Sequence, residues 1–125
     1  MLKILFLVLT GILAGCTTIQ PGTDGDWIGF TESGKASFYA NKFQNRKAVS
    51  GVLYDHNLNT AAHKKLPFGS VVKVTNTDNS KSVVVRVNDR GPFVKGRIIA
   101  LSKSAFSSIG NLSAGLIKVK IEVVW

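Results

Sequence analysis

The sequence predicts a small, mainly β domain whose strands close into a barrel. In the last run, at residues 116–125, Ile117, Val119, Ile121 and Val123 alternate with Lys118, Lys120 and Glu122. Two Val-rich runs, at residues 71–74 and 82–88, are joined by turn-forming residues, which predicts an antiparallel hairpin. The remaining strands are short and are separated by glycine-containing turns. A closed barrel is the favoured arrangement of such strands, because closure removes exposed strand edges.

The first strand is expected from Gly34, where Ala36, Phe38 and Ala40 alternate with polar neighbours. Residues 48–59 have little periodicity of either kind and are expected to form a loop. A turn with an apolar tip, LPFG at residues 66–69, then leads into the first strand of the hairpin.

The second strand of the hairpin begins the segment SVVVRVNDRGPF at residues 82–93. Its valines at alternate positions predict one buried face, and Val84, which breaks the alternation, suggests that the strand is covered on both sides. Turn-forming residues and Pro92 end the strand abruptly. Asp89 is therefore expected to be a carboxylate held at a strand end, although it could equally serve only to form an Asx-type turn.

A short helix is predicted after the apolar run at residues 97–101. Ser102 is a good N-cap, Ala105, Phe106 and Ile109 have the spacing of a buried helical face, and Gly110 is expected to end the helix in the left-handed conformation.

The N-terminal segment predicts export. A charged start, a short apolar centre and a small-residue exit are typical of a secretory signal peptide at residues 1–15. The sequence LAGC at residues 13–16 resembles the bacterial lipobox, which implies cleavage before Cys16 and lipidation of its thiol. More than one acyl chain gives stable membrane anchoring. Thr17, in place of the Asp that retains such lipoproteins at the inner membrane, favours the outer membrane with the domain facing the periplasm.

Residues 16–33 are expected to form a lipid-anchored tether, because they are rich in Thr, Gly and Asp and poor in large apolar residues. Trp27, Ile28 and Phe30 interrupt this composition and are expected to dock on the domain at residues 34–125.

The composition fits an exported domain. Cys16 is the only cysteine, so the domain has no disulfide and depends on its core for stability. The formal net charge is +9, and Lys3 is the one basic residue before Gly34, so the domain itself is cationic. We expect anionic envelope partners rather than nucleic acid, since no RNA motif or helical reading head is present. Asp55, His56 and His63 match no zinc spacing, so no metal is expected.

Five segments resemble the rare lipoprotein A (RlpA) family in order and spacing: ASFYA, SGVLYD, TAAHKKLPFGSVVKVTN, SVVVRVNDRGPF and RIIALS. The resemblance covers essentially residues 34–125 and implies a six-stranded double-psi β-barrel with one or two short helices. Active members are endolytic lytic transglycosylases without a cofactor. They cut peptidoglycan between N-acetylmuramic acid and N-acetylglucosamine, favour strands stripped of stem peptides and act at septa, where divisome proteins are possible partners. Many relatives continue into a SPOR domain, which we do not expect here.

The chemistry of a lytic transglycosylase needs proton transfers but no water. An acid protonates the leaving oxygen while the muramoyl C6 hydroxyl attacks C1, and one carboxyl group can serve both transfers. By resemblance this group is Asp89, and His63, from the TAAH motif, would orient Asp89 or the sugar. Tyr39, Asn88 and Arg90, from the matched motifs, are expected to bind the substrate.

The sequence departs from the family at two acidic positions. Val52 stands where catalytically competent members have a Glu, and Ala100 stands where an Asp is common. Val52 can neither donate nor accept a proton. The sequence therefore leaves two functions open: a minimal transglycosylase that depends on Asp89 and His63, and a catalytically impaired lipoprotein that binds peptidoglycan.

Overall fold

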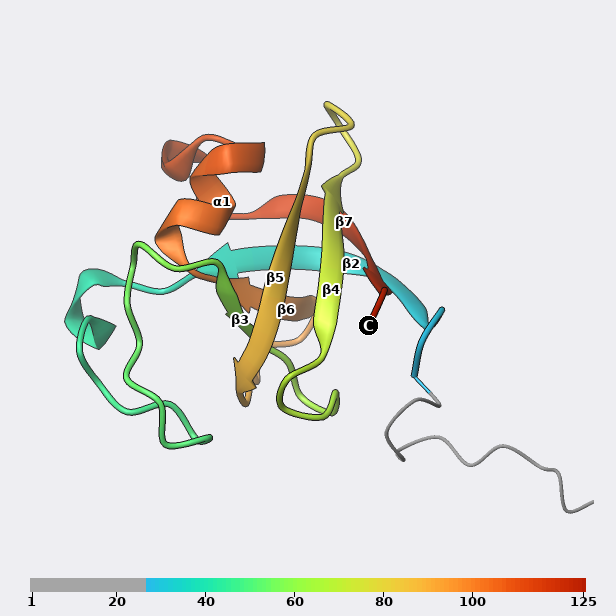
Figure 1. Ribbon diagram of the computed structural model, residues 1–125. Helices are drawn as coiled ribbons and strands as arrows, with labels where there is room; N and C mark the ends of the chain where they lie inside the picture. Colours follow the sequence, from blue (N-terminus) through green and yellow to red (C-terminus); the bar gives the residue numbers. More distant parts are fainter. Residues whose placement is uncertain (1–26) are drawn as a thin grey trace, which may run out of the picture.

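The computed structural model describes residues 27–125, and residues 1–26, with the expected signal peptide and Cys16, lie outside the described part. Within residues 27–125, six strands form a closed barrel in the order β2-β6-β3-β5-β4-β7, and one α-helix, α1, packs beside β5 (Figure 1). The prediction of a mainly β, closed barrel is confirmed. No helix within residues 27–125 is long and apolar enough to cross a membrane.

The strands are β2 (Thr31–Phe38), β3 (Thr60–Ala62), β4 (Val71–Asn76), β5 (Ser82–Asp89), β6 (Arg97–Leu101) and β7 (Ile117–Val123). The helix α1 spans Lys103–Ile109, and the 3-10 helices η3 and η4 span Asn41–Phe43 and Leu112–Ala114. Strand β2 pairs with β6, and β3 with β5, in parallel. The other four pairings are antiparallel, including the predicted β4–β5 hairpin and the β2–β7 pair that joins the two ends of the domain.

The barrel interior is filled by aliphatic side chains at alternate strand positions. In β7, every second residue is buried from Ile117 to Val123, and the intervening residues are exposed. The buried core comprises Ala36, Ala61, Leu66, Val72, Val74, Val85, Val87, Ile99, Leu101, Ala105, Phe106, Ile109, Ile117, Val119, Ile121 and Val123. Closely packed branched side chains of this kind fix the register of the strands, since a shift of one residue would turn every buried side chain outward.

Helix α1 is held in place at both ends by side chains. The Ser102 hydroxyl accepts a hydrogen bond from the Ala105 amide at 3.3 Å, as its predicted N-cap role requires. At the other end, the Asn76 side-chain amide donates to the Ile109 carbonyl at 2.8 Å. Gly110 does end the helix, but its backbone is extended rather than left-handed, which corrects that detail of the prediction. A Cβ there would lie 3.3 Å from Ile117, so close packing favours glycine.

Three further details differ from the expectations. Val84 is 51% exposed, so β5 is covered on one face only. Strand β3 lies at residues for which no strand was predicted, because three residues are too few to show a periodicity. Strand β2 begins at Thr31, ahead of Gly34 and within the segment expected to be a tether. Trp27 packs against the core, as expected for this residue.

Candidate active site

Asp89 is the last residue of β5, and its carboxylate accepts three hydrogen bonds. Oδ2 accepts from the Tyr39 hydroxyl at 2.7 Å. Oδ1 accepts from the backbone amides of Val49 at 2.7 Å and Arg90 at 2.9 Å. All three partners donate, which is the pattern expected around an ionised carboxylate. These contacts hold the carboxylate in one orientation. They come from the residue after β5 (Arg90), from the residue after β2 (Tyr39) and from a loop (Val49).

Tyr39 follows β2 directly, and its backbone amide donates to the Leu101 carbonyl at 3.0 Å. Its ring stacks on Tyr54 with 4.2 Å between centroids and meets Phe43 edge-on at 5.7 Å. Burial, and secondarily the hydrogen bond to Asp89, raise the pKa of Tyr39 well above its ordinary value. The phenol therefore stays protonated and acts as a fixed donor to Asp89.

A second layer of contacts supports Tyr39. The Tyr54 hydroxyl accepts a hydrogen bond from the Lys103 amide at 3.1 Å and lies 2.6 Å from Nδ1 of His56. Either group can donate in the bond between Tyr54 and His56, according to the tautomer of His56. Burial raises the pKa of Tyr54, partly offset by the Lys103 amide. Sequence reasoning did not identify this contribution of Tyr54, because the residue lies in a loop without periodicity.

Val52 lies in the loop that contacts Asp89. Its carbonyl accepts from the Ala48 amide at 2.8 Å, and the Ser50 amide donates to the Asn88 carbonyl at 3.3 Å, so the loop is attached to the end of β5. The Val52 side chain is 53% exposed. The loop therefore presents an aliphatic side chain to solvent at the position where active family members are expected to carry an acid.

The His63 side chain is directed to a different partner from the one expected. It is buried, its Nε2 lies 2.9 Å from a carboxylate oxygen of Glu32, and its Nδ1 accepts from the amides of Lys65 and Leu66 at 3.0 and 3.2 Å. Burial lowers the pKa of His63, although Glu32 acts in the opposite direction. Only the backbone of His63 contacts Asp89, with its amide donating to the Asp89 carbonyl at 3.1 Å.

Arg90 holds the loop that follows β3. Its guanidinium donates to the carbonyls of His63 at 3.2 Å and Leu66 at 2.8 Å, and lies 4.0 Å from the centre of the Phe68 ring. The structure thus brings Asp89, Tyr39 and the backbone of Asn88 together. It places the side chains of His63 and Arg90 in contacts that stabilise the loop.

Asp55, His56 and His63, the residues considered above for a zinc site, each have a different hydrogen-bond partner. Asp55 accepts from the Asn57 amide at 2.9 Å, His56 pairs with Tyr54, and His63 pairs with Glu32. Among residues 27–125, no three His, Cys, Asp or Glu side chains are grouped so that they could hold a metal ion.

Comparison with known proteins adds solved structures of the same fold. A Streptomyces papain inhibitor has a TM-score of 0.65 at 21% identity, with 78% of this chain and 97% of the inhibitor covered. An expansin of Clavibacter michiganensis, solved with cellohexaose, has a TM-score of 0.61 at 22% identity, with 76% of this chain and 50% of the expansin covered. Together with the strand order, these likenesses identify the barrel as the predicted double-psi type.

Sequence comparison gives closer relatives. The endolytic peptidoglycan transglycosylase RlpA of Vibrio cholerae is 60% identical over 96 residues, which cover 77% of this chain and 36% of the relative. The protein of the same name from Neisseria meningitidis serogroup A is 54% identical over 95 residues, covering 76% and 40%. The chain therefore matches only about a third to two fifths of the length of these curated relatives. The profile of the family described as lytic transglycolase matches residues 31–121. The chain thus belongs to the RlpA family and carries its lytic transglycolase domain.

Proposed function

We propose that this protein is an endolytic lytic transglycosylase that cleaves the bond between N-acetylmuramic acid and N-acetylglucosamine in peptide-poor peptidoglycan strands. The observation that carries the proposal is the Asp89 carboxylate, fixed at the end of β5 by Tyr39 and two backbone amides, in a domain of the lytic transglycolase family. The names of the relatives support the choice of substrate.

The reaction can proceed with Asp89 starting as a base. The carboxylate takes the proton of the muramoyl C6 hydroxyl as its oxygen forms a bond to C1. The bond between C1 and the leaving oxygen breaks, and that oxygen receives the proton from Asp89. One group thus serves both transfers, no water is consumed, and the product carries a 1,6-anhydro end. The three donors orient the carboxylate and stabilise its charged form before and after the reaction.

The proposal extends to the setting of the reaction. The lipobox-like sequence LAGC at residues 13–16 and the presence of Thr17 rather than Asp support a lipid-anchored protein on the periplasmic side of the outer membrane. The basic domain suits a polymer that carries carboxylates. In this setting the protein would act in wall remodelling and septation, with divisome proteins as partners.

The test is a digest of peptide-free glycan strands with the full chain in detergent micelles, read by mass spectrometry for 1,6-anhydromuramic ends. We expect such ends from the wild type and none from Asp89→Asn. Asp78→Asn is the matched control, because Asp78 lies in the exposed turn between β4 and β5, at the other end of the hairpin from Asp89.

Val52→Glu restores the family's acidic residue on the loop that contacts Asp89, and we expect it to increase the yield of anhydro ends. If the wild type binds strands but gives no product, and Val52→Glu gives product, the proposal of turnover is refuted. The protein would then be a peptidoglycan-binding lipoprotein that has lost its activity.

A further inference from the structure

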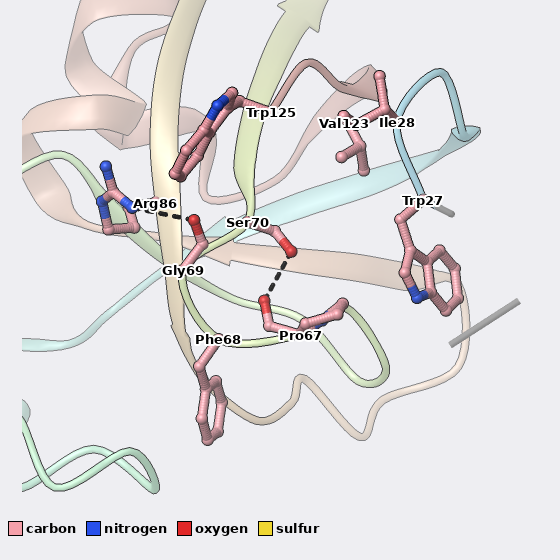
Figure 2. Close-up of a pocket in the computed structure, with 9 residues that line it drawn as sticks. All are labelled: Trp27, Ile28, Pro67, Phe68, Gly69, Ser70, Arg86, Val123 and Trp125. Carbon is pink, nitrogen blue, oxygen red and sulfur yellow. Dashed lines mark hydrogen bonds between the residues drawn. The ribbon is translucent and has the colours of Figure 1, made fainter. Parts of the chain in front are cut away.

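A cleft of about 430 Å³ lies next to the candidate active site without including Asp89. Figure 2 shows its lining, which combines aromatic side chains, a short loop and one arginine. Trp125, Phe68 and Arg86 surround the part of the cleft nearest β5, and Trp27 and Ile28 form its far side (Figure 2).

The cleft presents an exposed aromatic face beside a positive charge. Trp125 is 71% exposed, although its backbone is held by hydrogen bonds with Val71 at both its amide and its carbonyl. The Arg86 guanidinium lies 5.9 Å from the centre of the Trp125 ring. One of its nitrogens donates to the Gly69 carbonyl at 2.9 Å, which orients the group. A guanidinium has five N–H donors, so most of them remain available to a ligand.

The loop at residues 66–69 connects the cleft with the surroundings of Asp89. Arg90 binds the carbonyl at the start of this loop, and Arg86 binds the carbonyl at its end. Phe68 lines the cleft and lies under the guanidinium of Arg90, the residue after Asp89. Arg86 and Asp89 are both on β5, about 10 Å apart along the strand. An extended sugar chain of two or more rings can cover this distance.

We propose that this cleft is a saccharide subsite, in which Trp125 packs against a pyranose ring and Arg86 pairs with the free lactyl carboxylate of an N-acetylmuramic acid residue. The C–H face of a pyranose is apolar and matches an aromatic ring, and a guanidinium is suited to bidentate pairing with a carboxylate. This inference rests on the proposed function for the identity of the strand. It also explains why the protein would prefer glycan strands without stem peptides. A stem peptide is attached through the lactyl carboxylate and converts it into a neutral amide, so Arg86 would lose its charged partner.

The test measures binding of peptide-free muroglycan oligosaccharides to the full chain in detergent micelles by isothermal titration calorimetry. All proteins carry Asp89→Asn, so that no ligand is consumed. Trp125→Ala should weaken binding about tenfold or more, as truncation of a central aromatic contact does, whereas Trp125→Phe should keep most of the affinity. Arg86→Gln should also weaken binding about tenfold. Lys118→Gln, which removes the same charge from an exposed position on β7, is the control.

Chitin oligosaccharides of equal length separate the two contacts, since they lack the lactyl carboxylate. They should bind more weakly than muroglycan to the parent protein and should be insensitive to Arg86→Gln. Unchanged muroglycan binding in Trp125→Ala would overturn the subsite, and equal binding of the two sugars would overturn the assignment of Arg86. The binding assay and the digest can also give different outcomes. If the wild type gives no anhydro ends but Trp125→Ala weakens muroglycan binding, the subsite is supported and only the proposed turnover is refuted.

Discussion

The buried His63 side chain makes a specific prediction about stability and pH. Its Nδ1 accepts hydrogen bonds from the backbone amides of Lys65 and Leu66, so protonation of this nitrogen would break both bonds and direct three N–H groups at one another. Burial is the main cause that lowers the pKa of His63 below its ordinary value of 6.5. Replacement of His63 by Gln removes the titration.

The sign and size of the effect follow from the lowered pKa. Above about pH 6.5 His63 is neutral in both the folded and the unfolded state and adds no pH dependence. Below that pH the unfolded chain binds a proton that the folded protein does not. The free energy of unfolding then falls by up to about 1.4 kcal/mol per pH unit until the pH reaches the pKa of the folded state.

The assay is urea unfolding followed by circular dichroism, at intervals between about pH 5 and 8, where most carboxylates remain ionised. We expect the wild type to lose stability below about pH 6.5 relative to His63→Gln. Glu32→Gln removes the attraction that favours protonated His63, so in this variant the loss should continue to lower pH. Parallel curves for the wild type and His63→Gln across this range would refute the reasoning.

Three other substitutions test the site and the core. Tyr39→Phe keeps the stacked ring but removes a hydrogen bond to the Asp89 carboxylate. The initial rate of anhydro-end formation should therefore fall about tenfold or more. An unchanged rate would show that Tyr39 does not position Asp89. Phe106→Ala should lower the free energy of unfolding by about 3–5 kcal/mol, because Phe106 is fully buried. Val84→Ala, on the exposed face of β5, should change the free energy of unfolding by no more than about 0.5 kcal/mol. Similar losses in the two variants would contradict the assigned core. A Cβ on Gly34 would lie 2.6 Å from Cγ2 of Ile98, so Gly34→Ala should lower the free energy of unfolding by about 1–3 kcal/mol. The double variant with Gly34→Ala and Ile98→Ala should lose less than the sum of the losses in the two single variants.

The elements that sequence reasoning predicted are those with a local signal. The hairpin, the final strand and the Ser102 cap each depend on residues close together in the chain, and all three are present. Strand β3 gave no such signal, and the order of strands around the barrel depends on long-range pairing that no local pattern contains. The double-psi type could be predicted only from resemblance.

The candidate site shows the same division. Asp89 was predicted from its place at a strand end, but its donors come from Tyr39 and from Val49, a loop residue with no periodic pattern. The direction of the His63 ring could not be predicted, because its partner Glu32 lies within the segment expected to be a tether. Side-chain direction in loops depends on tertiary contacts, which a single sequence does not specify.

The pairing of β2 with β7 determines when the domain can fold. Ala36 pairs with Ile117, roughly 80 residues later, and closing a loop of that length costs roughly 4 kcal/mol of chain entropy before any contact repays it. The last strand also pairs with β4, so a chain that lacks it has two unpaired edges and an open core. Folding should therefore be slow and complete only after synthesis of the whole domain. Such late folding is compatible with the export that we propose, in which the chain crosses a membrane unfolded.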